Sequence, residues 1–200
     1  MPDIILAILA AGGSRRLGQP KQLVTVNDEC LLYRQCRIAL EASIGPVFVV
    51  LGSHAKVCEQ SIADLPLTIF FNEQWQEGMA SSLRCVTQVA MDSDASGLLV
   101  VLGDQYAITS DDLQDVYQFW IRSGGRKACR AHFEKYYGPP VILPRSSFHN
   151  TMKLTGDEGA RHILRSFPPD ELINIPMVNA ALDIDDPLQL SQARIFSGVV

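Results

Sequence analysis

The sequence lacks the features that define several other classes of protein. No apolar run approaches the roughly 18 residues that a membrane span needs. The start Met1-Pro2-Asp3 has no basic region ahead of the apolar stretch Ile4–Ala11, which indicates a buried strand and not a signal peptide. The five cysteines contain no C-x-x-C pair, and the four histidines show no metal-ligand spacing. We therefore expect no disulfide framework, no zinc site and a cytoplasmic location.

Basic residues are in the minority as well. The 200 residues include 17 Lys and Arg against 22 Asp and Glu, a net charge of −5 at pH 7. This balance excludes a protein that binds nucleic acid through bulk positive charge, and we expect no membrane partner. An anionic ligand must instead be held by a local set of donors. With 47% hydrophobic residues, the chain has enough apolar mass for one domain over residues 1–200.

Short apolar runs alternate with amphipathic stretches along the first half of the chain. This order predicts an α/β fold with a mainly parallel, doubly wound sheet. The predicted strands are Ile4–Ala10, Val47–Leu51, Leu67–Phe71 and Leu98–Leu102, and the predicted helices are Leu31–Ala42, Lys56–Ile62, Ala80–Met91 and Asp111–Ser123, the last capped by Thr109. After Gly124-Gly125 the pattern changes to the segments Lys127–His132 and Gly138–Leu143, helical pieces near Ser146–Leu154 and Glu158–Ser166, a strand at Leu172–Ile175 and a final helix from Pro187. We expect this half to elaborate the same sheet.

A glycine-rich loop with basic residues follows the first strand. Ligands of open α/β sheets bind at the carboxyl ends of strands, and small residues let backbone N–H groups wrap an anion. A Walker A loop would need Lys-Ser or Lys-Thr after the second glycine, whereas Gly18 is followed by Gln19-Pro20. The adjacent Gly12-Gly13 does not form a G-x-G-x-x-G dinucleotide fingerprint either. The loop therefore suits a nucleoside triphosphate without matching either common motif.

Two acidic positions suit a hard cation. Asp104 directly follows an apolar strand and Gly103, so its carboxylate projects at the end of a central strand. Mg²⁺ prefers one or two protein carboxylates together with phosphate oxygens and water. Alternation in an extended segment places Asp183 and Asp185 on one face, and either is a candidate second ligand.

The loop is similar to the signature L-A-A-G-x-S-x-R-(M/L)-G-x-x-K of the molybdenum cofactor cytidylyltransferase-like nucleotidyltransferases. Further segments match the same family in order: Asn72–Leu83, Leu102–Gln105, Gly138–Pro140, Gly156–Arg161 and Asp183–Pro187. The matches cover nearly the whole chain. They imply a single three-layer, Rossmann-like nucleotidyltransferase domain with a mainly parallel, mixed sheet.

The resemblance also implies residue roles. Catalytic roles fall on Lys21 and Arg15. The implied nucleotide-binding residues are Leu9, Ala10, Ala11, Gly12, Gly13, Ser14, Arg15, Lys21, Gly78, Ser82 and Asp104. The implied acceptor-binding residues are Gly138, Pro139, Gly156, Asp157 and Arg161, although Arg161 is equally suited to the surface of its own helix. The implied ligands of Mg²⁺, or of Mn²⁺, are Asp104 and Asp185.

Five positions refine or qualify this resemblance. Ala11 matches the cytidylyltransferase form of the signature, whereas related guanylyltransferases tend to have glycine there, so CTP is the expected nucleotide. Asp186 stands where threonine is usual, and Tyr106 where proline is common. Trp75 and Met79 lie within a matching segment but are residue types more typical of packing than of substrate contact.

The implied reaction transfers CMP from CTP to the phosphate of molybdopterin carrying molybdenum and releases pyrophosphate. A molybdenum hydroxylase would receive the product. Two alternatives stay open. The acceptor could be a sugar 1-phosphate or another phosphorylated molecule, or the chain could be a non-catalytic accessory protein that delivers cofactor to a hydroxylase.

Overall fold

A single mixed sheet organises the computed structural model, which describes residues 3–14, 19–26, 28–184 and 189. Its seven strands follow the order β5-β4-β1-β6-β8-β7-β9. The strands are β1 (Ile4–Ala10), β4 (Val47–Leu51), β5 (Thr68–Phe71), β6 (Gly97–Leu102), β7 (Ala128–Phe133), β8 (Tyr136–Pro144) and β9 (Leu172–Pro176), and a separate hairpin consists of β2 (Thr25–Val26) and β3 (Glu29–Cys30). The helices are α1 (Leu31–Glu41), α2 (Ala55–Gln60), α3 (Met79–Asp92), α4 (Ser110–Arg122), α5 (Phe148–Thr151) and α6 (Ala160–Leu164). Short 3₁₀ helices are η1 (Lys21–Leu23), η2 (Trp75–Glu77), η3 (Arg145–Ser147), η4 (Pro169–Glu171) and η5 (Val178–Ala181).

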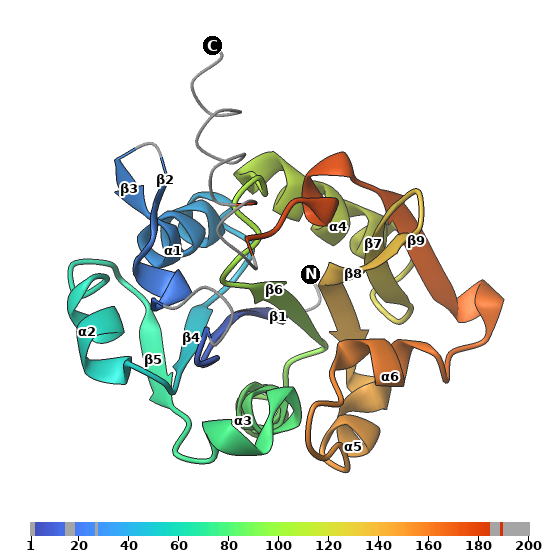
Figure 1. Ribbon diagram of the computed structural model, residues 1–200. Helices are drawn as coiled ribbons and strands as arrows, with labels where there is room; N and C mark the ends of the chain where they lie inside the picture. The colour runs from blue at the N-terminus through green and yellow to red at the C-terminus, as the bar shows by residue number, and fades with distance from the viewer. Residues whose placement is uncertain (1–2, 15–18, 27, 185–188, 190–200) are drawn as a thin grey trace.

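The pairing of the strands confirms the expected mainly parallel, mixed sheet. Strand β1 pairs in parallel with β4 and β6, and β4 with β5. Strand β8 runs antiparallel to both β6 and β7, and β9 lies parallel to β7. The start of β8 and the ends of β7 and β9 therefore lie at the same edge of the sheet as the carboxyl ends of β1 and β6 (Figure 1).

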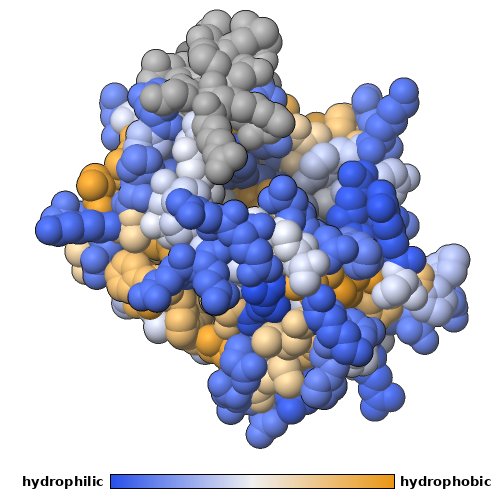
Figure 2. Space-filling model, turned by 60° about the horizontal axis from the view of Figure 1, so that its bottom comes forward, coloured by the Kyte–Doolittle hydropathy of each residue, from blue (hydrophilic) through white to orange (hydrophobic). Residues whose placement is uncertain are grey.

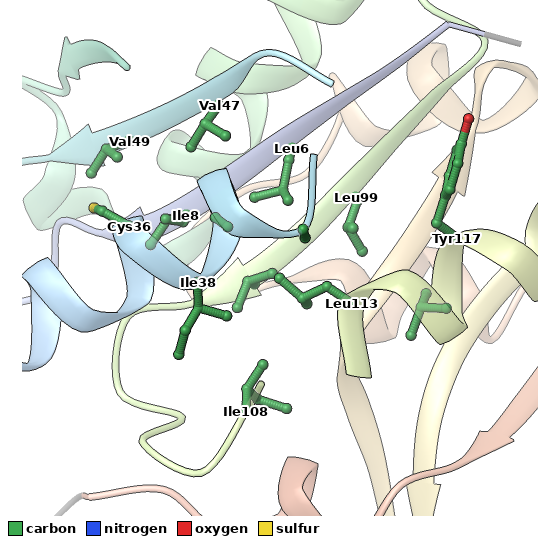
Figure 3. Close-up of a cluster of buried hydrophobic side chains, with 14 of the residues drawn as sticks. Leu6, Ile8, Cys36, Ile38, Val47, Val49, Leu99, Ile108, Leu113 and Tyr117 are labelled. Carbon is green, nitrogen blue, oxygen red and sulfur yellow. The ribbon is translucent and has the colours of Figure 1, made fainter. Parts of the chain in front are cut away.

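Helices cover both faces of the sheet, which gives three layers (Figure 1). Successive strand residues alternate between the two faces: Ile4, Leu6 and Ile8 pack against α1, α2 and α4, whereas Ile5 and Ala7 pack against α3, α5 and α6. Figure 3 shows the first of these clusters, with strand side chains such as Leu6 and Ile8 beside α1. Burial on both faces explains why the strands appear in the sequence as continuous apolar runs.

The capping prediction for α4 is confirmed. The Thr109 side chain accepts a hydrogen bond from the Asp112 backbone N–H, and the Asp112 carboxylate accepts one from the Thr109 backbone N–H. This capping box fixes where α4 begins. The other predicted helices and strands are present with ends that differ by a few residues, and the final helix predicted from Pro187 begins outside the described residues.

Neither disulfides nor a membrane span marks the described structure. All five cysteines are free thiols. None of the helices within the described ranges combines the length and the apolar character that crossing a membrane requires. Figure 2 shows a face on which hydrophilic residues cover most of the area, with apolar residues in scattered groups between them.

Candidate active site

A cavity of about 560 Å³ opens at the carboxyl ends of β1 and β6. The loop after β1, η2, the start of α3 and the turn after β6 form its walls. Every predicted nucleotide-binding residue that the structure describes lines it: Leu9, Ala10, Ala11, Gly12, Gly13, Ser14, Lys21, Gly78, Ser82 and Asp104. The fold thus gathers residues from distant parts of the sequence around one cavity. Arg15 lies outside the described residues.

Gln22 fixes the signature loop through hydrogen bonds from its buried side chain. Its side chain is 5% exposed, and its amide Nε2 donates hydrogen bonds to the Ala10 carbonyl (2.8 Å) and the Gly12 carbonyl (2.7 Å). The two ends of the loop also meet directly, because the backbone N–H of Lys21 donates to Ser14 Oγ at 2.8 Å. Sequence reasoning gave Gln22 no role, although it directly follows the lysine of the signature. A buried amide that satisfies two loop carbonyls fixes the loop conformation.

Lys21 and Asp104 meet inside the cavity. The Lys21 ammonium Nζ lies 2.7 Å from Asp104 Oδ2, and both side chains are largely buried. The other carboxylate oxygen of Asp104, Oδ1, is buried and has no hydrogen-bond partner among the described residues. A buried carboxylate oxygen without a partner is costly unless a cation or a donor completes the site.

This arrangement fits the metal role implied for Asp104. A single carboxylate with an open oxygen beside a space for phosphates is the donor set that Mg²⁺ uses when substrate oxygens and water supply the remaining ligands. Within the described ranges, no group of three or more His, Cys, Asp or Glu forms a self-sufficient metal site. The backbone N–H of Ile184 donates to the Asp104 carbonyl at 3.2 Å, so the chain directly after Asp183 lies beside Asp104. Asp185, the predicted second ligand, lies outside the described residues.

Trp75 forms a wall of the cavity against two glycines. A Cβ added at Gly13 would lie 3.2 Å from the Trp75 ring, and one added at Gly52 would lie 2.5 Å from Trp75 Cβ. The indole therefore packs closely on the signature loop and on the end of β4. Trp75 and Met79, which is 41% exposed, both line the cavity. Trp75 and Met79, whose residue types are more typical of packing, thus also face the cavity.

The start of α3 is held by Asn72. Its amide Nδ2 donates to Ser81 Oγ (2.8 Å) and Ser82 Oγ (2.9 Å), and it is buried. Ahead of the helix, Gly78 has φ +126°, a conformation that side-chain-bearing residues rarely adopt. Asn72 orients the hydroxyl of Ser82 at the edge of the cavity. It is a positioning residue that the sequence analysis did not single out, despite its place at the start of a matching segment.

Part of the predicted acceptor segment packs on this same helix start. The Gly156 carbonyl accepts a hydrogen bond from the Ala80 N–H at 3.0 Å, and a Cβ at Gly78 would collide with the Gly156 carbonyl. Asp157 lines the cavity next to the predicted nucleotide-binding residues. The structure therefore places Gly156 and Asp157 in the wall that contains Gly78.

An ion pair between Arg84 and Glu77 stabilises the cavity wall that contains Gly78. Arg84 pairs with Glu77 at 2.6 Å and donates to the Leu154 carbonyl, also at 2.6 Å, while Glu77 accepts from the Gly156 N–H at 3.3 Å. The hydrogen bond from the Arg84 guanidinium lowers the pKa of Glu77 below its ordinary value. Together these contacts tie the segment 154–156 to α3.

Gly138 and Pro139 lie elsewhere, at the start of β8, and do not line the cavity. The Pro139 carbonyl accepts hydrogen bonds from Gln105 Nε2 and from the Tyr136 hydroxyl, both at 2.7 Å. Gln105 Nε2 also donates to the Ala180 carbonyl at 3.0 Å, and burial raises the pKa of Tyr136. Buried Gln105 therefore joins the turn that holds Asp104 to β8 and η5. The predicted acceptor residues thus form two groups on either side of this turn. The first group is Gly156 and Asp157, and the second is Gly138 and Pro139.

Arg161 lies on α6, which packs against β8. Its side chain is exposed, and it forms no ion pair with any residue that the structure describes. Its charge acts on the hydroxyl of Tyr136, on which Asp104 acts as well. Arg161 is therefore near the second group of predicted acceptor residues.

Known proteins share both the sequence pattern and the fold. Residues 6–172 match the model of the MobA-like NTP transferase domain. Purine catabolism protein PucB of Bacillus subtilis is 26% identical over 173 residues, 82% of each chain. The crystal structure of a homologue of Mycobacterium tuberculosis rv0371c, from Mycobacterium sp. strain JC1, superposes with a TM-score of 0.83 at 26% identity, over 97% of this chain and 96% of that one.

The fold is shared more widely. Molybdopterin-guanine dinucleotide biosynthesis protein A from Archaeoglobus fulgidus superposes with a TM-score of 0.68 at 14% identity, over 98% of this chain and all (100%) of that one. This likeness concerns the fold. The match to the family model extends over most of the sequence, from β1 to β9. The chain therefore belongs to the MobA-like NTP transferase domain family and is a nucleotidyltransferase.

Proposed function

We propose that this nucleotidyltransferase transfers CMP from CTP to the phosphate of molybdopterin carrying molybdenum, with Mg²⁺ as the metal, and forms molybdopterin cytosine dinucleotide and pyrophosphate in the cytoplasm. The observation that supports the proposal best is the 2.7 Å contact of Lys21 with Asp104 inside the cavity formed by the signature loop. The seven-stranded sheet takes strands from Ile4 to Pro176, which supports one nucleotidyltransferase domain over residues 1–200.

The reaction needs no covalent enzyme intermediate. A phosphate monoester has a second pKa of about 6 and is largely dianionic at pH 7. One of its oxygens attacks the α-phosphorus of CTP and forms the new P–O bond. The bond between the α-phosphorus and the oxygen that bridges to the β-phosphate breaks, and the electron pair leaves with pyrophosphate. Alignment of the two substrates and neutralisation of their charge therefore carry most of the catalysis.

The chain supplies groups for both tasks. In this proposal Lys21 moves from Asp104 to the phosphates and stabilises the charge that develops on pyrophosphate, and Arg15 has the same role by resemblance. The backbone N–H groups of the loop from Gly12 to Ser14 line the cavity and cradle the phosphates. Asp104, with Asp185 or Asp183, would hold Mg²⁺, which neutralises charge on the attacking and α-phosphates when bound. Mn²⁺ could take the same place.

The preference for CTP rests on Ala11. Ala11 belongs to the apolar cluster on the α3 face of the sheet and also lines the cavity. In this proposal Leu9–Gly12, Gly78 and Ser82 contact the base and ribose. Replacing Ala11 by glycine, as in related guanylyltransferases, should shift the preference toward GTP.

The acceptor is assigned to the side of the cavity that faces Gly138, Pro139 and Arg161, with Gly156 and Asp157 at its border. Supporting observations are the hydrogen bond from Gln105, the neighbour of Asp104, to the Pro139 carbonyl and the effect of the Arg161 charge on the pKa of Tyr136, which burial raises. The product would pass to a molybdenum hydroxylase.

The test is direct detection of the product. We would incubate the protein with CTP, Mg²⁺ and molybdenum cofactor and measure the dinucleotide by mass spectrometry, with Asp104→Asn as the inactive control. Formation of the cytosine dinucleotide by the wild type alone supports the proposal. A nucleotidylated sugar phosphate in a parallel acceptor screen would replace the acceptor. Binding of cofactor without any pyrophosphate release would indicate an accessory protein instead.

A further inference from the structure

An arginine outside the cavity is held in an unusually defined position. The guanidinium Cζ of Arg130, on β7, lies 4.5 Å from the centroid of the Tyr137 ring, and its Nε donates to Asn174 Oδ1 on β9 at 2.7 Å. The His132 ring lies 4.4 Å from that of Tyr137 and extends the same stack. A stacked guanidinium bound at Nε keeps its two terminal NH₂ groups available as a planar pair of donors.

A second arginine belongs to a helix on the same side of the sheet. Arg130 follows Ala128 by two residues on β7, so it faces the side of the sheet that α3, α5 and α6 cover (Figure 1). Arg161 is part of α6. Burial lowers the pKa of Arg130, and the positive charge of Arg161 lowers it further. Both groups stay charged, because arginine does not lose its proton in proteins.

No carboxylate compensates these charges in the described structure. Neither Arg130 nor Arg161 forms an ion pair with a described residue, although Asp and Glu outnumber Lys and Arg by 22 to 17 in the sequence. Two cations that repel each other in a partly desolvated place are destabilised until an anion joins them. This arrangement favours a ligand anion in place of a protein carboxylate.

Neither arginine lines the cavity, and Arg130 lies on β7, two strands from β6, the strand that Asp104 follows. Arg130 is paired with Val141 on β8, which is the neighbour of β6, and the Tyr137 under Arg130 lies at the start of β8, the sheet edge where Asp104 projects. Two strand spacings, roughly 10 Å, separate β7 from β6. Arg130 is level with Val100, four residues before Asp104, which adds up to roughly 13 Å along the strands. A molecule with its phosphate near Asp104 and a second anionic group at its other end could span this distance.

We propose that Arg130 and Arg161, with Tyr137 as the platform, form a second subsite that binds an oxyanion group of the acceptor, distinct from the phosphate that is nucleotidylated. The identification of the bound molecule as the acceptor rests on the proposed function, whereas the binding of an oxyanion by the two arginines does not. The subsite selects acceptors that are anionic at both ends.

The binding test uses the full-length protein and inorganic probes. We would titrate molybdate and sulfate into the wild type and into Arg130→Gln, Arg161→Gln and Arg126→Gln by calorimetry, with CTP and Mg²⁺ present to occupy the nucleotide site. Arg126→Gln is the matched control, because it removes one exposed arginine at the opposite end of β7. We expect one oxyanion to bind the wild type and Arg126→Gln, and binding at least tenfold weaker in the other two variants. Equal binding in all four proteins, or none in the wild type, would overturn the subsite.

The kinetic test separates this inference from the proposed function. With any acceptor that supports turnover, Arg130→Gln should raise the acceptor KM at least tenfold and leave kcat and the CTP KM within about twofold, and Arg130→Lys should recover part of the loss. An unchanged acceptor KM would contradict the subsite while leaving the transferase intact. Oxyanion binding that depends on Arg130 in a protein inactive with molybdenum cofactor would keep the subsite and reject the proposed acceptor.

Discussion

Lys21 and Asp104, which are 83 residues apart in the sequence, form an ion pair in which Nζ lies 2.7 Å from Oδ2. The proposed reaction needs each of them for a different partner, Lys21 for phosphate oxygens and Asp104 for a metal ion. The pair therefore keeps both groups in place until the nucleotide and metal separate them.

Removing the lysine tests this arrangement. Lys21→Ala should lower turnover by on the order of 10²–10³-fold, since it removes a charge that stabilises the leaving pyrophosphate. The melting temperature should also fall, because the two side chains are only 16% and 22% exposed and the variant leaves Asp104 without its cation. Turnover is therefore compared at a temperature at which the variant is folded. Lys153→Ala, at an exposed lysine, is the control for both measurements. Turnover within a few-fold of the wild type would remove Lys21 from the mechanism.

Replacing Asp104 should abolish the metal dependence of nucleotide binding. In Asp104→Asn, the carboxylate that would hold Mg²⁺ is gone while the size of the side chain is kept. We expect the affinity for CTP to become independent of Mg²⁺ over a titration that strengthens binding to the wild type. If the variant and the wild type respond equally to Mg²⁺, Asp104 is not a metal ligand.

The two tryptophans provide an internal reporter of the cavity. Trp75 lines it, whereas Trp120 is fully buried within the layer of α1 and α4. Nucleotide addition should therefore change the tryptophan fluorescence of the wild type and leave that of Trp75→Phe nearly constant. Calorimetry would verify that the variant still binds. A full signal in Trp75→Phe would show that the nucleotide does not approach Trp75.

Substitution by alanine should affect stability at one glycine near the loop and nucleotide binding at another. At Gly52 the new Cβ would lie 2.5 Å from Trp75 Cβ, so Gly52→Ala should lower the free energy of unfolding by about 1–3 kcal/mol. At Gly12 nothing lies within 4 Å of the added Cβ, which would enter the cavity. Gly12→Ala should therefore keep the stability and weaken nucleotide binding. Denaturant unfolding and a CTP titration measure the stability and the nucleotide affinity of both variants. A larger loss of stability in Gly12→Ala than in Gly52→Ala would contradict the packing of Trp75.

Acid should weaken the wall formed by Glu77 and Arg84. The pKa of Glu77 is below its ordinary value of 4.5 in the folded protein, so the ionised carboxylate favours folding above pH 4.5. This contribution is lost as the pH falls from 4.5 through the lower folded-state pKa. The stability difference between the wild type and Glu77→Gln should thus be present at pH 7 and decrease as the pH falls below 4.5. Glu73→Gln, at an exposed glutamate, should show no such change; the same pH dependence there would point to a general acid effect.

Local patterns in the sequence predict most of the fold. The apolar runs of β1 and β4 and the Thr109 cap of α4 depend on neighbouring residues, and each is found where it was expected. The short hairpin of β2 and β3 was not predicted, because strands of two residues leave no periodic signal. Exact helix ends likewise depend on tertiary contacts.

The candidate site could be predicted only in part for the same reason. The signature identifies residues at the cavity, but Gln22 and Asn72 act through carbonyls and hydroxyls that folding brings to them. The division of the predicted acceptor residues into two groups follows from the turn that Gln105 anchors, which no local pattern reveals. Arg130 stands out only when β7, β8 and β9 lie side by side.

The central claim is that this chain is a cytidylyltransferase for molybdenum cofactor, and pyrophosphate release tests it most directly. The wild type would be assayed with Mg²⁺ and molybdenum cofactor against CTP, GTP, ATP and UTP side by side, with Lys21→Ala as the blank. We predict release with CTP well above the other three and none from the variant. Release with GTP alone would keep the mechanism and overturn the role of Ala11, and silence with all four nucleotides would contradict the account.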